Sequence, residues 1–244
     1  MTPRIRWQRA RLADSRLETR RARTLVLDVP EWVGHDAGQH VDVKLTGEDG
    51  FTAQRSYSIA SASVPGRLEL TVQAVSGGIV SPYLVDTMEL GDQLELRGPI
   101  GGWFRWTDQL AEPVLLVGGG SGIAPLMAML RQRLLTGSAA PFHLVYSART
   151  PDHVFYANEL HAISQGERDI GVDLLYTRSG LPGETRLPGR LSRDDLPGAA
   201  PGDPPTRVYV CGPNGFVENV ARLLVERGHQ PASIRTERFG SSGG

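Results

Sequence analysis

The segment Arg55-Ser56-Tyr57-Ser58 combines residue types that could bind a flat, charged cofactor. In an extended strand, Arg55 and Tyr57 lie on one face, and Ser56 and Ser58 lie on the other. An arginine can hold a diphosphate, an aromatic ring can lie against a flat ring system, and a serine hydroxyl can donate to a ring nitrogen. A bound flavin nucleotide needs these contacts, although any half-buried strand could carry the same four residues.

A glycine-rich stretch before a predicted helix offers a second contact for a phosphate. Gly77 and Gly78 let a phosphate approach the backbone, and Ser81 precedes Pro82, which suits the first position of a helix. Helix N-termini present free N–H groups and a positive dipole end to an anion. Either Ser81 simply caps this helix, or the stretch forms with Arg55 the two halves of a pyrophosphate clamp.

A further glycine-rich segment, Gly118 to Pro125, lies between a continuous apolar run and a helical pattern. In a doubly wound sheet, such a strand-to-helix turn holds the phosphates of a nucleotide. The segment departs from the Rossmann fingerprint, because Ile123 stands where the third glycine is required, and it lacks the Gly-Lys-Ser/Thr ending of a P-loop. Together with the flavin-like segment, it implies two bound nucleotides.

The segment Cys211-Gly212-Pro213 also ends a predicted strand and begins a predicted helix. A free cysteine in such a place is commonly a small buried apolar residue. Because ligands bind at the carboxyl ends of parallel strands, its polarizable thiol could instead contact a nicotinamide ring.

Arginines follow two other predicted strands. Arg149 comes after the strand that ends at Ser147, and Thr177-Arg178 comes after the strand that ends at Tyr176. A hydroxyl and arginines beside a strand end are what a ribose 2′-phosphate needs, with Arg190 as a further candidate. Taken singly, each arginine could equally be an ordinary surface residue.

Composition and charge exclude several classes of protein. The chain has 244 residues and a formal net charge of −1, which gives no general basis for nucleic-acid or membrane binding. Cys211 is the only cysteine, so the 244 residues can form neither a disulfide with one another nor an iron–sulfur cluster held by four thiolates. The histidines show no metal-ligand spacing. The basic N-terminal residues lack the apolar run of a signal peptide, so we expect a cytoplasmic protein.

Two patterns of secondary structure divide the chain. Up to residue 108, short strands alternate with turns, which predicts a six-stranded antiparallel β-barrel interrupted by one helix, Tyr83–Met88. The expected strands are Ile5–Ala13, Thr24–Val29, His40–Leu45, Gln54–Ala60, Arg67–Ala74 and Gln93–Arg97.

From residue 109, strands alternate with helices, which predicts an α/β domain with a parallel sheet covered on both faces. The expected strands are Val114–Val117, Phe142–Ser147, Val172–Tyr176 and Arg207–Cys211. The expected helices are Pro125–Leu135, Tyr156–Ile163 and Pro213–Arg227. We therefore expect two domains, residues 1–108 and residues 109–244.

These segments occur in the order of a known family. The chain resembles the ferredoxin–NADP reductase superfamily through six segments, namely Arg55–Ser58, Gly77–Ser81, Gly98-Pro99-x-Gly101, Gly120–Pro125, Cys211–Pro213 and Glu237-x-Phe239. The resemblance spans nearly the whole chain. It is greatest to compact bacterial reductases of oxygenase electron-transfer chains, without their fused iron–sulfur domain. It implies an FAD-binding antiparallel barrel followed by an NAD(P)-binding domain.

The resemblance also implies residue roles. Arg55 and Ser81 would hold the FAD pyrophosphate, Tyr57 would pack on the isoalloxazine and Ser58 would bond near flavin N5. The implied flavin-binding residues are Arg55, Ser56, Tyr57, Ser58, Gly77, Gly78, Val80, Ser81 and, on the flavin's other face, Phe239. Five residues follow Phe239, whereas several relatives end on the aromatic ring. No aromatic clamp for adenine stands out in the sequence, so FMN remains an alternative to FAD.

A second group of residues is implied for NADP. These residues are Gly120, Ser121, Gly122, Ile123, Pro125, Arg149, Thr177, Arg178, Arg190, Cys211, Gly212 and Pro213. Ser58, Cys211 and Glu237 are the implied catalytic residues: Cys211 would lie against the nicotinamide, and Glu237 matches an acidic residue tied to proton movement.

The leading interpretation is an FAD-dependent NAD(P)H:acceptor oxidoreductase that prefers NADPH and passes single electrons to a separate acceptor. We expect a monomer whose partner is a small acidic iron–sulfur protein such as a ferredoxin, or an oxygenase component. The eight arginines among the first 23 residues could steer such a partner, or could simply lie on a solvated strand. One alternative is a reductase of free flavin, quinone or oxygen. Another is a non-catalytic flavoprotein that senses NADPH or scaffolds a partner.

Overall fold

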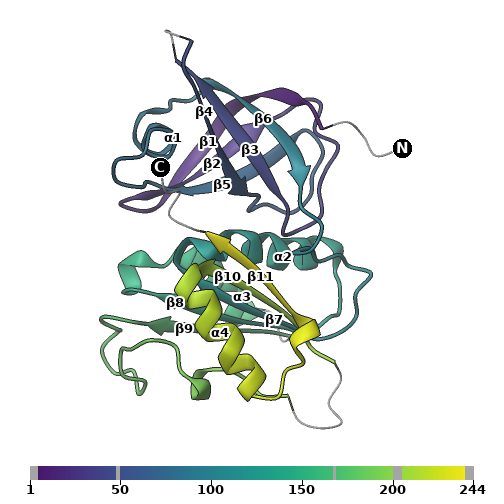
Figure 1. Cartoon of the computed structure of the whole chain (residues 1–244), viewed down its shortest axis with the longest axis vertical. Coiled ribbons are helices and arrows are strands. Elements are labelled where there is room, and N and C mark those ends of the chain that lie inside the picture. Colours follow the sequence, from purple (N-terminus) through teal and green to yellow (C-terminus); the bar gives the residue numbers. More distant parts are fainter. Residues whose placement is uncertain (1–4, 48–49, 167–168, 200–204, 240–244) are drawn as a thin grey trace. The chain divides into compact units, whose positions relative to one another are not determined.

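The structure is a computed structural model that describes residues 5–47, 50–166, 169–199 and 205–239. These residues form two compact units, which Figure 1 colours along the sequence. The first unit comprises the chain up to Thr107 together with Met127–Leu135, and the second comprises Asp108–Leu126 and the chain from Thr136 onward.

The first unit is built on one antiparallel sheet of six strands, in the order β4-β3-β6-β1-β2-β5 (Figure 1). Its strands are β1 (Trp7–Thr19), β2 (Ala22–Asp28), β3 (His40–Thr46), β4 (Thr52–Ser58), β5 (Arg67–Gln73) and β6 (Gln93–Ile100). The six predicted strands are confirmed. The end strands β4 and β5 share one isolated bridge, Ile59 to Leu70, so no ladder closes the sheet into a barrel within the described residues.

Strand β1 is longer than the sequence predicted, because it serves two partners in turn. Trp7–Arg11 pairs with β6, and Arg11–Thr19 pairs with β2. A register shift between Leu12 and Asp14 lies just after the point where the partner of β1 changes. Such an irregularity bends a strand and increases its twist, which lets one strand continue from one neighbour to the next.

The core of this unit follows from alternation along the strands. Leu25 and Leu27 on β2 lie opposite Leu70 and Leu68 on β5, and all four are 0% exposed. Burying a leucine contributes roughly 1.5–3 kcal/mol relative to leaving it in water. These side chains therefore fix which face of the sheet points inward.

A short helical segment follows β5. It consists of α1 (Val80–Pro82) and a π-helical turn, η1 (Tyr83–Thr87). The predicted helix is present, but the prediction that Ser81 caps it is wrong, because Ile79 occupies the cap position. Ser81 lies inside the first turn, where its Oγ accepts a hydrogen bond from the Val75 N–H at 3.1 Å.

The second unit is built on a parallel sheet of five strands, in the order β11-β10-β7-β8-β9. Its strands are β7 (Val114–Gly119), β8 (Phe142–Ala148), β9 (Ile170–Tyr176), β10 (Arg207–Pro213) and β11 (Ile234–Phe239). The four predicted strands are confirmed. The sequence prediction missed β11, because this end strand alternates with charged residues and is nowhere fully buried.

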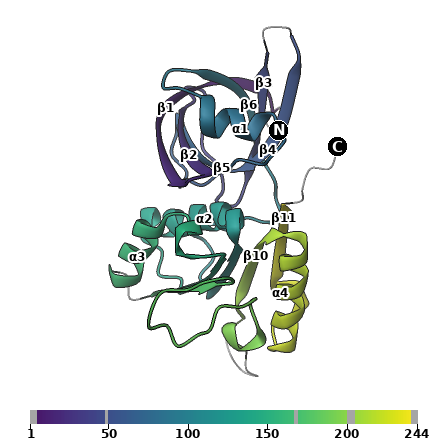
Figure 2. The same cartoon turned by 90° about the vertical axis from the view of Figure 1, so that its left-hand side faces the viewer.

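Helices cover both faces of this parallel sheet, as predicted. The helices of this unit are α3 (Ala157–Gly166) and α4 (Asn214–Glu226), and α2 (Ile123–Thr136) begins in it, although Met127–Leu135 belongs to the first unit. Figures 1 and 2 show α3 on one face of the sheet and α4 on the other. Short 3-10 turns complete the unit at η2 (Gly120–Gly122), η3 (Pro151–His153), η4 (Arg193–Asp195) and η5 (Pro231–Ser233). Among the helices of the described chain, none has both the length and the apolar character needed to cross a bilayer.

Candidate cofactor-binding site

Strand β4 presents Arg55 and Tyr57 on the same face of the first sheet. Arg55 lies opposite Val43, and Tyr57 lies opposite Val41, and both valines belong to the core. Tyr57 packs against this core, and burial raises the pKa of its hydroxyl to about 12. Arg55 remains exposed, and its guanidinium donates to the Gln54 carbonyl at 2.6 Å. Its remaining N–H groups are suited to an anion such as a diphosphate.

The other face of β4 carries the two serines. Ser56 donates to Asp42 Oδ1 at 2.6 Å, and Arg97 donates to Asp42 Oδ2 at 2.9 Å. Burial opposes ionisation of Asp42, but these two donors bring its pKa below the ordinary value. The proton of Ser56 is therefore committed to Asp42. Sequence reasoning missed Asp42, although the alternation of His40-Val41-Asp42-Val43 already placed it on the polar face of β3.

Ser58 differs from Ser56 in the hydrogen bonding of its hydroxyl. Its side chain is buried, at 5% exposure, and its Oγ has no hydrogen-bond partner among the described residues. The residue opposite it is His40, whose pKa is lowered by burial. An unsatisfied buried hydroxyl costs about 1–3 kcal/mol, so its persistence points to a ligand that accepts the proton. A ring nitrogen of a flavin fits this donor.

The glycine-rich stretch before α1 lies close to this strand. Helix α1 contacts both β4 and β5 within the first unit. Gly77 has a φ of 76°, which favours glycine, and a Cβ built there would meet no atom within 4 Å. A Cβ built at Gly78, by contrast, would lie 3.2 Å from the Val75 carbonyl oxygen. Val80 is 1% exposed and anchors the turn in the core.

The second unit has a point where its strand order reverses. The chain runs from β7 to β8 and β9, then returns to place β10 on the other side of β7. Nucleotides bind outside the carboxyl ends of strands at such a switch point. Gly118 on β7 and Cys211 on β10 are neighbours in register there.

Glycines allow a close backbone approach at this point. A Cβ on Gly122 would lie 2.2 Å from the Cys211 carbonyl oxygen, so only glycine fits. Gly120 has a φ of 56° and an open side, which leaves room for a phosphate at the start of α2. Ser121 is half-buried in the turn, whereas Ile123 and Pro125 are buried and anchor the first turn of α2.

Cys211 and Glu237 are neighbours in register on β10 and β11. Cys211 is 0% exposed, and burial, reinforced by the charge of Glu237, raises its pKa well above the ordinary value. It is therefore a buried neutral thiol, and contact with a nicotinamide stays a prediction. Burial raises the pKa of Glu237 to about 7, and its Oε2 has no partner among the described residues. Glu237 can thus hold or release a proton near neutral pH.

The segments around these residues end the same two strands. Gly212 and Pro213 complete β10, and Phe239, which is half-buried, is the neighbour of Pro213 in register at the end of β11. The five residues after Phe239 lie outside the described residues.

Two of the arginines expected at a 2′-phosphate, Arg149 and Arg178, lie at neighbouring strand ends, and Arg190 follows Gly189, whose N–H donates to the Tyr176 carbonyl at 3.0 Å. The Thr177 N–H donates to the Ala148 carbonyl and the Arg178 N–H donates to the Arg149 carbonyl, each at 2.9 Å. These contacts bring the ends of β8 and β9 together. Arg149, Arg178 and Arg190 all have exposed side chains. Such a group of exposed cations suits an anionic ligand.

Two family models match consecutive parts of the chain. The oxidoreductase FAD-binding domain matches residues 10–105, and the oxidoreductase NAD-binding domain matches residues 116–222. The chain belongs to the ferredoxin–NADP reductase superfamily. It is an oxidoreductase with one domain for FAD and one for a pyridine nucleotide, as the sequence motifs predicted.

Curated relatives are reductase components of oxygenase systems. The chain is 34% identical over 206 residues to the glycine betaine monooxygenase reductase subunit of Pseudomonas aeruginosa, covering 83% of this chain and 56% of the relative. It is 28% identical over 213 residues to the toluate 1,2-dioxygenase electron transfer component of Pseudomonas putida, covering 84% of this chain and 59% of the relative. The chain thus spans little more than half the length of these relatives.

Solved structures share the fold. The FAD/NAD-binding domain of nitric oxide dioxygenase from Vibrio cholerae aligns with a TM-score of 0.85 at 23% identity, over 96% of this chain and 98% of that one. A ferredoxin NADP+ reductase from Neisseria gonorrhoeae aligns with a TM-score of 0.79 at 22% identity, over 95% of this chain and 98% of that one. At these identities the likeness shows the architecture alone.

Several arginines on β1, on β2 and in the turn between them form contacts within the first unit. Arg11 pairs with Asp28 at 3.0 Å, and Arg16 pairs with Glu69 at 2.7 Å. Arg21 donates to Ser76 at 2.9 Å, and Arg23 donates to the Met88 carbonyl at 2.7 Å. Arg4 lies outside the described residues. These contacts stabilise the strand, and whether the remaining exposed arginines, Arg9 and Arg20, steer a partner stays a prediction.

Across the described residues, no three His, Cys, Asp or Glu side chains gather closely enough to hold a metal ion.

Proposed function

We propose that this chain is an FAD-dependent NAD(P)H:acceptor oxidoreductase that prefers NADPH and passes electrons to a separate ferredoxin or oxygenase component. The observation that carries the proposal is the buried hydroxyl of Ser58, which has no hydrogen-bond partner among the described residues. It lies on the strand whose opposite face presents Arg55 and Tyr57. The names of the relatives, which are reductase and electron transfer components, support the same reaction class.

In this proposal, residues 1–108 bind the flavin. Arg55 and Ser81 hold its pyrophosphate, Tyr57 lies against its ring system, and Ser58 donates a hydrogen bond to its ring edge. When bound, FAD supplies the exchange between a two-electron donor and one-electron acceptors. The protein contributes orientation, because the rates of such transfers depend steeply on alignment.

Residues 109–244 bind the pyridine nucleotide in the same proposal. The Gly120–Pro125 turn holds its pyrophosphate at the start of α2. Arg149, Thr177-Arg178 and Arg190 hold a ribose 2′-phosphate, which accounts for the preference for NADPH. Cys211 shapes the nicotinamide pocket. Glu237 holds a proton near neutral pH, since its pKa is about 7.

Anaerobic stopped-flow mixing with NADPH or NADH tests this function through the bleaching of the yellow flavin band. We expect fast bleaching by NADPH, slow bleaching by NADH, and a smaller difference in Arg178→Ala. Fast bleaching by NADH alone would discard the 2′-phosphate site but retain the enzyme. No bleaching by either nucleotide would refute the oxidoreductase proposal.

A further inference from the structure

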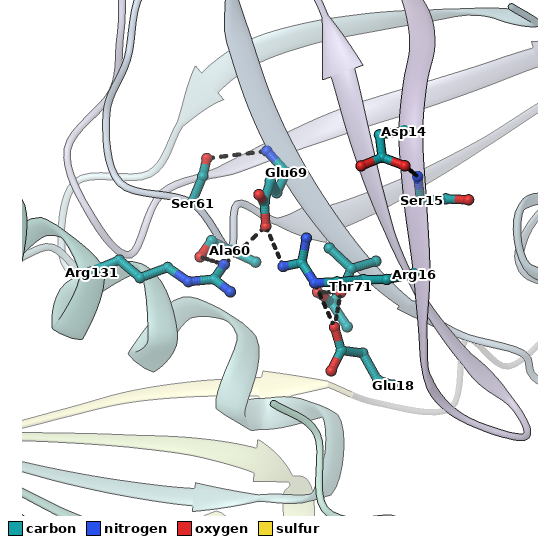
Figure 3. Close-up of polar contacts among 10 residues, drawn as sticks. Asp14, Ser15, Arg16, Glu18, Ala60, Ser61, Glu69, Thr71 and Arg131 are labelled. Atoms are coloured by element: carbon teal, nitrogen blue, oxygen red, sulfur yellow. Dashed lines mark hydrogen bonds and ion pairs between the residues drawn. The ribbon is translucent and has the colours of Figure 1, made fainter. Parts of the chain in front are cut away.

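Helix α2 holds the chain segment that follows β4. Arg131 Nη1 donates to the Ala60 carbonyl at 2.8 Å and to Glu69 Oε2 at 3.0 Å (Figure 3). One residue further along α2, Gln132 Oε1 accepts a hydrogen bond from the Ser63 N–H at 2.7 Å. The Arg131 side chain is only 14% exposed, so water screens these contacts weakly.

Glu69 is the anchor that these contacts share. Its backbone N–H donates to Ser61 Oγ at 3.1 Å, and its carbonyl accepts from the Ala60 N–H at 2.8 Å. The same oxygen, Oε2, also accepts a hydrogen bond from Arg16 Nη2 at 2.7 Å (Figure 3). Of the two arginines bonded to Glu69, Arg131 is therefore the one that also bonds Ala60.

The segment held in this way begins two residues after Ser58. Ile59 lies between them, and its N–H donates to the Gln39 carbonyl at 3.0 Å. Two residues span at most about 7 Å, so a shift at Ala60 moves Ser58 as well. No ladder joins β4 to β5 among the described residues, so the side-chain contacts from α2 add to the restraint given by the isolated Ile59–Leu70 bridge and by the backbone bonds of Ile59 and Ala60.

We propose that Arg131 is a positioning residue of the flavin site, holding Ala60 against Glu69 and thereby setting the place of the Ser58 hydroxyl. This inference rests on the proposed function. A small displacement of a contact to a reacting group costs rate rather than affinity, because alignment acts on the transfer step. Substitution of Arg16 provides a matched control, because it removes a guanidinium from the same carboxylate and leaves the contact with Ala60 in place.

The test compares Arg131→Met with Arg16→Met in the full chain. We expect Arg131→Met to lower the limiting rate of flavin reduction about tenfold while changing the KM for NAD(P)H less than about twofold. We expect Arg16→Met to keep the rate within about twofold, and Arg131→Lys to recover part of the loss because it restores one charged donor. Equal loss of rate in the two Met variants would overturn the proposal, as would an unchanged rate in Arg131→Met.

A second readout does not depend on activity. Amide hydrogen exchange of a peptide covering residues 57–64 should speed up in Arg131→Met and stay unchanged in Arg16→Met. Unchanged exchange in Arg131→Met would overturn the proposal even if the wild type proved not to be reduced by either nucleotide. If Arg131→Met does not fold, both measurements are made on Arg131→Lys, with Arg16→Met as the control. Faster amide exchange and a lower rate of flavin reduction in Arg131→Lys, but not in Arg16→Met, would support the positioning role. Wild-type behaviour of Arg131→Lys in both would overturn it.

Discussion

Ser58 and Glu237 each leave a buried oxygen without a hydrogen-bond partner in the part of the chain that the structure describes. Native proteins bond most such atoms, because an unpaired buried polar group costs about 1–3 kcal/mol. Both residues stand in segments that the family resemblance links to chemistry. We therefore interpret them as groups held ready for a ligand or a proton.

Replacing Ser58 by alanine should separate stability from activity. The variant removes an unsatisfied hydroxyl, so we expect its melting temperature to stay the same or rise, while flavin reduction slows about tenfold or more. Ser56→Ala is the control, because Ser56 donates to Asp42 and its loss should lower stability by about 1 kcal/mol. Thermal unfolding and stopped-flow reduction of both variants measure this. A stability loss in Ser58→Ala would mean that its hydroxyl has a structural partner.

Glu237 should make stability depend on pH. Its pKa is raised from the model-compound value of 4.5 to about 7, so the folded state favours the protonated carboxyl. The contribution of Glu237 to the free energy of unfolding is fully present below pH 4.5 and is lost as the pH rises through 7. At pH 7.5, we expect Glu237→Gln to be more stable than the wild type by about 3 kcal/mol, a gap that closes toward pH 4.5.

Urea unfolding of both proteins at several pH values measures this difference. Titrations of other carboxyl groups cancel in the comparison, since they are common to both proteins. A gap that does not vary with pH would show that Glu237 ionises like an exposed carboxyl.

At the scale of elements, the turn between β7 and α2 depends on one glycine. A Cβ at Gly122 would meet the Cys211 carbonyl oxygen at 2.2 Å, and neither backbone can yield without opening the sheet. We expect Gly122→Ala to lose about 3 kcal/mol of stability and most of its affinity for the pyridine nucleotide.

Gly215→Ala, in the first turn of α4, provides the comparison. No atom lies within 4 Å of a Cβ built at Gly215, so alanine should be neutral or slightly stabilising there. Thermal melts and nucleotide titrations of the two variants measure the contrast. Equal melting temperatures for both would show that the turn tolerates a side chain at position 122.

The elements also show what sequence could predict. Alternating residues located the six strands of the first sheet, because one face of each is buried. Strand β11 escaped prediction, since an end strand can carry the charges of Ile234–Phe239 without burying them. The cap assigned to Ser81 failed because its hydroxyl bonds backward to Val75 instead of forward into the helix.

The candidate site was predictable in part. Local sequence placed Arg55, Tyr57 and Ser58 on one strand, and the structure confirms that arrangement. The contact of Arg131 with Glu69 joins residues 62 apart in sequence, and no local pattern contains it. The unpaired state of Ser58 was equally invisible, because it depends on everything packed around the strand.

At the scale of the whole molecule, the proposed function needs an electron acceptor other than an iron–sulfur cluster held by the residues of this sequence. The chain has one cysteine, Cys211, which is buried, so its residues cannot ligate an iron–sulfur cluster through four thiolates. Its net charge of −1 and the ion pairs of Arg11 and Arg16 predict weak electrostatic steering. Association with an acidic partner would then depend on local contacts and only modestly on salt.

Reduction of cytochrome c should therefore require an added carrier. With NADPH and this chain alone, we expect rapid reduction of ferricyanide and slow reduction of cytochrome c. Adding a [2Fe–2S] ferredoxin should speed cytochrome c reduction at least about tenfold, because in the proposed function such a carrier takes single electrons from the flavin. The rate should fall less than about threefold between 50 and 200 mM salt, since exposed paired charges are weakly felt at a distance. Apo-ferredoxin is the control. Equal cytochrome c reduction with and without the holo-ferredoxin would place the acceptor in another class, and a steep loss with salt would show that a basic docking surface operates after all.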